Sequence, residues 1–388
     1  MTITSDIRYI GVDDHEIDLF EGQYIVPNGM AYNSYVVLGS DKTAVMDTVD
    51  ARFRDKWMDN ARAALGGRAP DYLVIHHMEP DHSACIADFL AANPSTTVVS
   101  SAQAFRMMKQ FFGSDYADRR LVVKDGDVLD LGGHTLAFIA APMVHWPEVM
   151  VSYDAADKVL FSADGFGRFG ANDADGSEGW DDEARRYYIG IVGKYGPQTQ
   201  ALLKKAASLE IAAICPLHGP VLKGADIARA VKRYLTWSSY GIESEGVCIA
   251  YTSVYGHTKA AALRFRDMLL AKGCERVEVS DLARDDQYKA VADAFRYGRL
   301  VLATTTYNTD IFPWMRHFVQ HLVERGFQGR KVGIIENGSW APAAAKVIKG
   351  MFADSKGVTF CENTVTLLSA LDAASEAKLE ALADEILA

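Results

Sequence analysis

His77-Met78-Glu79-Pro80-Asp81-His82 places two imidazoles and two carboxylates within one short segment. The segment follows residues 71–76, an apolar run that predicts a buried strand. Alternate side chains of an extended chain share a face, so we expect the first, third and fifth residues of the segment to point the same way. A turn at Pro80 would bring His82 to them. Imidazole and carboxylate are ligands of first-row metal ions, so the segment predicts a metal site at a strand end.

Composition and charge limit the class of protein. The 388 residues predict two domains or slightly more, and 49% hydrophobic with 23% charged residues is typical of globular proteins. The net charge of −11 argues against a nucleic-acid partner. No apolar run is long enough to cross a bilayer, so we expect no membrane association through a spanning helix.

The five cysteines are scattered and form no C-x-x-C pair. This pattern predicts reduced thiols and a cytoplasmic location rather than a disulfide framework. It also argues against a four-cysteine iron site within the chain.

Three further metal-ligand candidates lie at the ends of predicted strands in the first 220 residues, where strands and helices indicate a layered α/β arrangement. They are His145, Asp164 and His218. Each one alone would be an ordinary loop residue. Together with the first segment they make seven ligands, which is more than one metal ion needs and suits two ions that share a carboxylate.

The ligand order H-x-E-x-D-H, His, Asp and His-Gly-Pro resembles the metallo-β-lactamase fold and, more narrowly, the flavodiiron proteins. The resemblance implies an αββα sandwich. It assigns His77, Glu79, His145 and Asp164 to one iron, and Asp81, His82, Asp164 and His218 to the other. The zinc hydrolases of this fold usually carry His where Glu79 stands, and a carboxylate there favours iron over zinc.

The second half of the chain changes pattern after a polar stretch that ends near residue 246. We therefore expect domains at 1–245 and 246–388. Strands and helices then alternate five times, with the fifth strand expected at 358–361. This alternation predicts a doubly wound parallel sheet.

Three loops that follow strands of this sheet carry hydroxyls and glycines, and the first one opens a helix whose N-terminus suits a phosphate. Together they resemble the FMN site of the flavodoxin fold. The candidate FMN-binding residues are Ser253, Val254, Tyr255, Gly256, His257, Thr258, Thr305, Thr306, Tyr307, Asn308, Gly338, Ser339 and Trp340. The loops depart from the family pattern at Thr305 and in the placing of Gly338 and Ser339.

Joining the two halves, the resemblance implies an oxidoreductase that reduces dioxygen to water, nitric oxide to nitrous oxide, or both. The implied cofactors are two Fe ions and FMN. The implied partners are a separate electron donor, such as a rubredoxin or a flavin reductase, and a second copy in a head-to-tail homodimer or a dimer of dimers. The alternatives are a zinc-dependent hydrolase, which leaves the second half unexplained, and an electron-carrier flavoprotein with a degenerate metal site.

Other histidines fit simpler roles. His317 and His321 are four apart on a predicted helix but lack a third ligand, so we expect a packing or surface pair. His76 should face away from the metal ligands. Trp340 suits simple packing or, by the resemblance, a place between flavin and iron.

Overall fold

The computed structural model describes residues 2–174 and 179–388. Two compact units divide the chain: Met1–Tyr188 with Pro197–Leu235, and Ile189–Gly196 with Thr236–Ala388. We retain 1–245 and 246–388 as the proposed domains.

The first unit contains two sheets, and the first of these has parallel strands on one side and antiparallel strands on the other. β1 pairs antiparallel with β6 and β6 with β7, whereas β7, β8, β9 and β10 are parallel. In spatial order the strands are β1 (Ile7–Tyr9), β6 (Tyr35–Leu38), β7 (Thr43–Met46), β8 (Tyr72–Val74), β9 (Thr97–Ser100) and β10 (Arg120–Val122).

The second sheet is antiparallel apart from the pairing of β14 with β15. In spatial order its strands are β11 (Val128–Asp130), β12 (Thr135–Ala140), β13 (Met150–Asp154), β14 (Val159–Phe161), β15 (Ala213–Cys215) and β16 (Leu222–Lys223). Two small antiparallel pairs accompany the sheets: β2 (Val12–Asp14) with β5 (Met30–Tyr32), and β3 (Leu19–Phe20) with β4 (Tyr24–Ile25).

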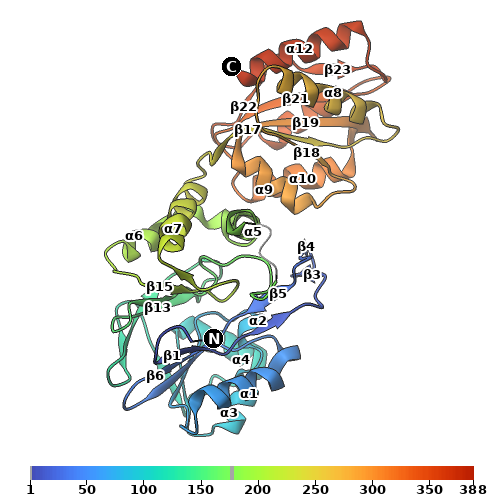
Figure 1. The fold of residues 1–388 in the computed structure, drawn as a ribbon. Helices are drawn as coiled ribbons and strands as arrows, with labels where there is room; N and C mark the ends of the chain where they lie inside the picture. The colour runs from blue at the N-terminus through green and yellow to red at the C-terminus, as the bar shows by residue number, and fades with distance from the viewer. Residues whose placement is uncertain (1, 175–178) are drawn as a thin grey trace. The chain divides into compact units, whose positions relative to one another are not determined.

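The core of this unit lies between the two sheets. Val37, Val74 and Met46 of the first sheet belong to the same buried cluster as Phe138 and Phe161 of the second. Helices cover the outer faces, with α1 and α3 beside the first sheet and α6 and α7 beside the second (Figure 1). Its helices and helical turns are η1 (Ala51–Phe53), α1 (Arg54–Leu65), α2 (Pro80–Ser83), α3 (Ile86–Ala92), α4 (Ala102–Phe112), α5 (Trp180–Tyr187), α6 (Gly196–Ala206) and α7 (Ala225–Ser238). The turns η2 (Tyr188–Val192) and η3 (Gly193–Tyr195) lie almost wholly in the segment Ile189–Gly196 of the second unit. This layering confirms the expected αββα sandwich.

The second unit is a parallel sheet in the doubly wound order, which confirms the sequence prediction. Its strands are β18 (Val277–Asp281), β17 (Ser244–Tyr251), β19 (Tyr297–Tyr307) and β21 (Lys331–Asn337), followed by β22 (Thr359–Phe360) and β23 (Val365–Leu367); β20 (Asp310–Ile311) pairs antiparallel with β19. α8 (His257–Ala271) and α12 (Ala373–Leu387) cover one face, and α9 (Gln287–Arg296) and α10 (Pro313–Glu324) cover the other (Figure 1). α11 (Ala344–Met351) packs against α10.

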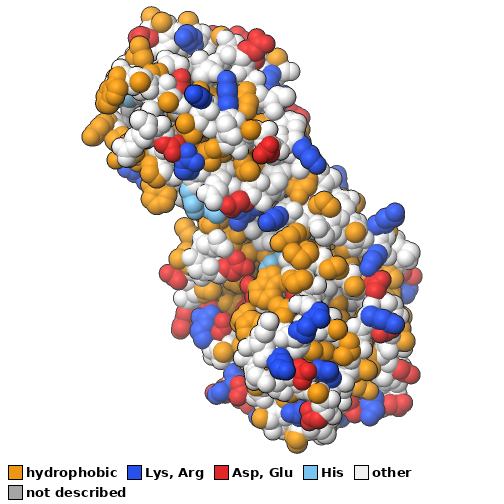
Figure 2. Space-filling view, turned by 180° about the vertical axis from the view of Figure 1, so that it is seen from behind, with side chains coloured by type: hydrophobic (Ala, Val, Ile, Leu, Met, Phe, Trp, Pro, Cys, Tyr) orange, Lys and Arg blue, Asp and Glu red, His pale blue; other side chains and the backbone are white. Residues whose placement is uncertain are grey.

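The described surface has two features that bear on function. None of the described helices is long and apolar enough to cross a membrane. On the face shown in Figure 2, Lys and Arg side chains are interspersed with Asp and Glu and do not gather by sign. That distribution lacks the basic stripe of a nucleic-acid-binding face.

Candidate functional site

The ligand segment after β8 turns into a helix earlier than the sequence predicts. Glu79 is still extended, with φ −60° and ψ 138°, but Pro80 begins the short helix α2. Proline suits the first position of a helix, because an N–H group at that position would have no acceptor within the helix and its absence in proline costs nothing. The expectation that Asp81 continues the extended segment was therefore wrong. The helical turn separates Asp81 and His82 from the ligands that precede them.

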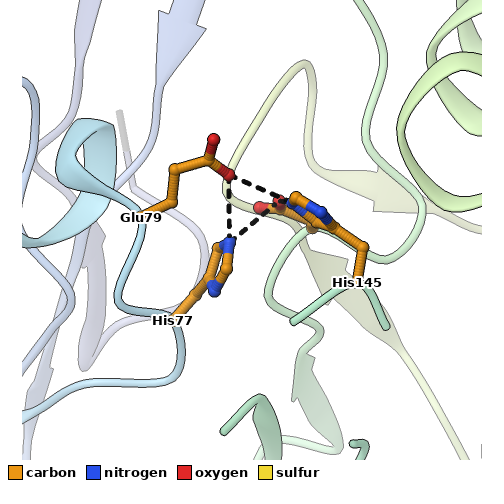
Figure 3. A group of neighbouring side chains, drawn as sticks. His77, Glu79 and His145 are labelled. Atoms are coloured by element: carbon orange, nitrogen blue, oxygen red, sulfur yellow. Dashed lines mark hydrogen bonds and ion pairs between the residues drawn. The ribbon is translucent and has the colours of Figure 1, made fainter. Parts of the chain in front are cut away.

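Four of the seven candidate ligands converge in a first group, composed of His77, Glu79, His145 and Asp164. Nε2 of His145 lies 2.9 Å from Oδ2 of Asp164 and 3.1 Å from Oε2 of Glu79. Nε2 of His77 lies 3.2 Å from the same Glu79 oxygen. Figure 3 shows His77 and Glu79, which lie on one segment, and His145, which lies on another, pointing toward a common point.

The other three candidates, Asp81, His82 and His218, form a second group. The Nε2 atoms of His82 and His218 are 2.9 Å apart, and Nε2 of His218 lies 3.3 Å from Oδ2 of Asp81. Asp164 connects the two groups, because its Oδ1 lies 3.4 Å from Nε2 of His82. The fold thus brings all seven residues together at the ends of β8, β12, β14 and β15.

In the described part of the chain, the seven side chains leave several of their oxygens without hydrogen bonds, as expected for a site that binds metal ions. All seven side chains are buried or nearly so, yet both oxygens of Asp81 and Oδ1 of Asp164 have no hydrogen-bond partner among the described residues. Buried carboxylate oxygens without partners are costly unless a cation compensates them. Two groups of ligands that share one carboxylate suit two metal ions.

Without metal, the site stabilises imidazolium–carboxylate pairs. Burial favours the neutral form of His145, but its hydrogen bonds to Asp164 and Glu79 outweigh burial and raise its pKa to about 9. Burial likewise opposes ionisation of Asp164, yet the charge of His77 and the close contacts with His145 and His82 hold its pKa well below the ordinary value. A metal ion must displace these protons, so its binding will depend on pH.

Two buried carboxylates that the sequence did not single out hold the start of the ligand segment. Oε1 of Glu148 lies 2.9 Å from Nδ1 of His77. Oδ2 of Asp47 lies 2.6 Å from Nδ1 of His76, whose Nε2 lies 2.8 Å from Oγ of Ser152. His76 therefore makes its contacts away from the metal groups. Asp47 follows β7 and Glu148 precedes β13, so both lie far from the ligand segment in the sequence and local spacing carried no signal for either.

A third cluster of potential ligands comprises His134, Asp154 and Asp157. Asp154 is fully buried and is already satisfied on both oxygens: Oδ1 lies 3.1 Å from Nδ1 of His134, and Oδ2 accepts the N–H of Asp157. We interpret this cluster as a structural link between two hairpin turns of the second sheet.

The second unit carries a cavity of about 660 Å³ at the carboxyl ends of its strands. Twelve of the thirteen candidate FMN residues line it, and the thirteenth, Gly256, adjoins them with a φ of 96° that favours glycine. Oγ of Ser253 accepts the Gly256 N–H at 3.0 Å, and Oγ1 of Thr258 accepts from Nδ2 of Asn337 at 3.2 Å. Trp340 stands at the rim with 82% of its surface exposed.

The cavity also has lining residues that the sequence analysis missed. They are Thr309, Asn337, Ala341, Ala343 and Ser369. Ser369 was missed because the fifth strand was expected only at 358–361, whereas β23 continues the sheet and delivers this residue to the same edge. The rule that strand ends line one crevice would have found it if β23 had been recognised.

His317 and His321 pack together on α10 and do not line this cavity; His317 is exposed and His321 is partly buried. Their Nε2 atoms are 2.9 Å apart, and Nη1 of Arg325 donates to Nδ1 of His321 at 2.8 Å. Nδ1 of His317 contacts Oε1 of Gln287. One chain of hydrogen bonds thus accounts for both rings, as expected for a packing pair.

Comparison with known proteins identifies relatives of both units. A family model described as ODP family beta lactamase matches residues 30–219. Diflavin flavoprotein A 1 of Synechocystis sp. is 34% identical over 261 residues, which cover 66% of this chain and 45% of that protein. The anaerobic nitric oxide reductase flavorubredoxin of Aliivibrio fischeri is 27% identical over 371 residues, which cover 91% of this chain and 72% of that protein. The chain thus spans less than half of the first relative.

Solved structures match over both units. The rubredoxin oxygen:oxidoreductase of Desulfovibrio gigas superposes with a TM-score of 0.92 at 26% identity, covering 100% of this chain and 97% of that chain. The flavodiiron protein of Giardia intestinalis has the same fold, with a TM-score of 0.91 at 24% identity and coverage of 99% and 95%. Together with the two ligand groups and the cavity, these matches show that the chain is similar in sequence and fold to flavodiiron proteins over both units.

Proposed function

We propose that this protein is a flavodiiron oxidoreductase whose first unit holds two irons and whose second unit holds FMN. The observation that carries the proposal is the position of Asp164 between two complete ligand groups. His77, Glu79, His145 and Asp164 would hold the first iron. Asp81, His82, Asp164 and His218 would hold the second, with Asp164 bridging.

Iron is favoured over zinc by the chemistry of the first group. Glu79 contributes a carboxylate, and its Oε2 lies within 3.2 Å of both histidines of that group. Each metal position would then have two histidines and two carboxylates. This mixed ligand set favours iron, whereas a set of imidazoles alone is typical of a zinc site. A hydrolase would also leave the cavity of the second unit without a role.

FMN fits the cavity by its size and by the groups at its edges. The turn from Ser253 to Thr258 would hold the phosphate at the N-terminus of α8, where backbone N–H groups and two hydroxyls lie. The loops at 305–308 and 338–340 would flank the ring system. The exposed face of Trp340 supports a role in contact with the flavin or with a partner.

The substrate is a small gas, either dioxygen, nitric oxide or both, as the names of the matched relatives suggest. Two ferrous ions and a fully reduced FMN, when bound, would together supply four electrons. The chain supplies aromatic walls: Trp146 packs edge-on to His77, and Phe20 and Tyr187 pack against His218. Such walls admit an uncharged diatomic molecule and limit the entry of water.

Electrons would come from a separate donor, such as a rubredoxin or a flavin reductase. We further propose a head-to-tail homodimer or a dimer of dimers, in which Trp340 approaches Glu79 of the partner subunit. The five free thiols are consistent with a cytoplasmic location.

Metal analysis combined with absorption spectroscopy tests the proposal. Protein from iron-replete cells should contain about two irons and one FMN per chain. It should consume dioxygen or nitric oxide when supplied with reduced donor. Stoichiometric zinc in such protein would contradict the iron site, and folded protein that does not take up FMN would contradict the role of the second unit.

A further inference from the structure

Glu148 is a buried carboxylate that contacts the ligand segment without belonging to either metal group. Its side chain is fully buried, and Oε1 accepts the backbone N–H of Met78 at 2.8 Å and faces Nδ1 of His77 at 2.9 Å. Since a carboxylate accepts, Nδ1 of His77 must carry the proton. With a proton on Nδ1, Nε2 is the nitrogen of His77 that is available to a metal ion, and it points toward Glu79 and Asp164.

In the part of the chain that the structure describes, the histidines of the second group have no carboxylate next to Nδ1. Nδ1 of His218 faces the carbonyl oxygen of Ala31 at 2.8 Å, which is a neutral acceptor. Nδ1 of His82 has no hydrogen-bond partner among the described residues. An anionic acceptor makes an imidazole a stronger donor to a metal than a neutral acceptor does. The two metal positions therefore receive unequal electrostatic support.

The segment that carries Glu148 also carries a ligand of the first group. His145 enters that group directly, and the Trp146 ring packs edge-on to His77 with centroids 5.2 Å apart. Oγ of Ser101, which caps α4, donates to the carbonyl of Glu148 at 3.0 Å and anchors the segment. Both histidines of the first group thus depend on one short stretch of chain.

The second oxygen of Glu148 gives independent reason to look beyond a structural role. Oε2 is buried and has no hydrogen-bond partner among the described residues. A carboxylate kept in such surroundings destabilises the fold unless its charge is compensated. A metal ion bound to Nε2 of His77, whose Nδ1 contacts Glu148, would compensate that charge.

We propose that Glu148 is a positioning residue that makes the first metal position, formed by His77, Glu79, His145 and Asp164, the tighter-binding of the two and lowers its reduction potential. The inference rests on the proposed diiron site. Partners of this kind contribute about 10–100-fold to metal affinity. Negative charge behind a ligand favours the more oxidised metal, so removing that charge should raise the potential.

Glu148→Gln tests the proposal because it keeps the shape of the side chain and removes its charge. Purified apoprotein is loaded anaerobically with Fe²⁺ and equilibrated against chelators of increasing strength. The variant should lose iron from the first position about 10–100-fold more readily than wild type, with the second position unchanged. Anomalous diffraction at the iron edge identifies the position that empties, and a redox titration should show a shift to more positive potential.

Asp154→Asn is the matched control, since it also removes charge from a buried carboxylate paired with histidine. It should retain wild-type iron affinities at both positions. Glu148→Asp keeps the charge but withdraws it from His77 by one methylene, and it should also weaken the first position selectively. This second variant keeps the proposal testable if Glu148→Gln does not fold.

The outcomes separate this inference from the proposed function. Wild type that binds no iron would overturn both. If wild type binds two irons, equal weakening of both positions in Glu148→Gln, or the same loss in Asp154→Asn, would overturn the role of Glu148 alone. Full wild-type affinity at the first position in both Glu148 variants would do the same.

Discussion

Oδ2 of Asp164 lies 2.9 Å from Nε2 of His145, while the other oxygen of the same carboxylate is directed toward the second ligand group. Asp164 is buried at the end of β14, between the segments that carry the two groups. A single side chain therefore limits how far apart two bound metal ions can be. Its removal should weaken metal binding at both positions.

Asp164→Ala should lower the iron content at both positions, because it removes the shared ligand. We expect less than about half of the wild-type iron after reconstitution and dialysis, as for removal of a direct ligand rather than a supporting residue. Metal analysis of the folded variant measures this, with Asp154→Asn as the control for loss of a buried carboxylate. Iron content equal to wild type would show that the bridge is wrongly assigned.

His145→Ala and His218→Ala should separate the two positions. His145 belongs only to the first group and His218 only to the second, so each variant should lose mainly one iron. Spectroscopy of ⁵⁷Fe-loaded protein can follow the two irons individually. The idea of two distinct positions fails if both variants lose the same iron, or if both lose all of it while remaining folded.

The sequence predicted all seven candidate ligands but not the residues that contact and orient them. The residues that would bind metal lie directly after strands, where a local pattern reveals them, and the structure brings all seven together. Glu148 reaches the site through the packing of the second sheet on the first, and Asp47 reaches it through the pairing of β7 with β8 in the first sheet. No spacing in the sequence connects Glu148 with His77, so tertiary structure was needed to find the contact.

The errors have local physical causes. Pro80 was expected to turn an extended chain, but a proline is also well placed to start a helix, and here it does so. β22 and β23 are too short to show a clear period, which hid the loop that contains Ser369. The long strands β17 and β19 were found easily because their buried runs are continuous.

Replacing Ser253 and Thr258 with Ala should weaken FMN binding without unfolding the second unit. Each hydroxyl lines the cavity at the start of α8, and a hydrogen bond to a charged phosphate contributes about 1.5–3 kcal/mol, or about tenfold or more in Kd. Fluorescence quenching of added FMN measures the affinity. Ser239→Ala, outside the cavity lining, should bind FMN as wild type does. Unchanged affinity in the double variant would place the phosphate elsewhere.

The α10 histidine pair should make the apoprotein less stable in mild acid. Burial and the neighbouring Arg325 charge lower the pKa of His321 to about 4, below the value of about 6.5 in an unfolded chain. The unfolded state therefore binds the proton first as pH falls. The stability from neutral His321 is complete above about pH 6.5 and is lost as pH falls through about 4.

Urea unfolding of wild type and His321→Gln, followed between about pH 7 and pH 4, checks this prediction. Wild type should lose more stability over that range than the variant does. His15→Gln, at an exposed position of the first unit, is the control for a histidine change elsewhere. Parallel pH profiles for wild type and His321→Gln would contradict the buried neutral state of His321.

The proposed head-to-tail dimer has a direct test by subunit exchange. His82→Ala should abolish the second metal position, and the Ser253 and Thr258 double variant, dialysed and assayed without added FMN, should retain little flavin, so each homodimer should have little activity. A mixed dimer would pair the flavin of one subunit with the irons of the other. That arrangement restores one complete junction and, because a two-fold interface contains two junctions, about half of the wild-type activity per dimer.

Activity should therefore rise as subunits exchange, in proportion to the fraction of mixed dimer measured by mass. Trp340→Ala introduced into the FMN-binding subunit should reduce the recovered activity, since its exposed ring is proposed to lie at the restored junction. The same change in the subunit that lacks FMN should have little effect, because that junction is already broken. If mixed dimers form and no activity returns, electrons must pass between flavin and irons of the same chain, and the proposed pairing across subunits is wrong.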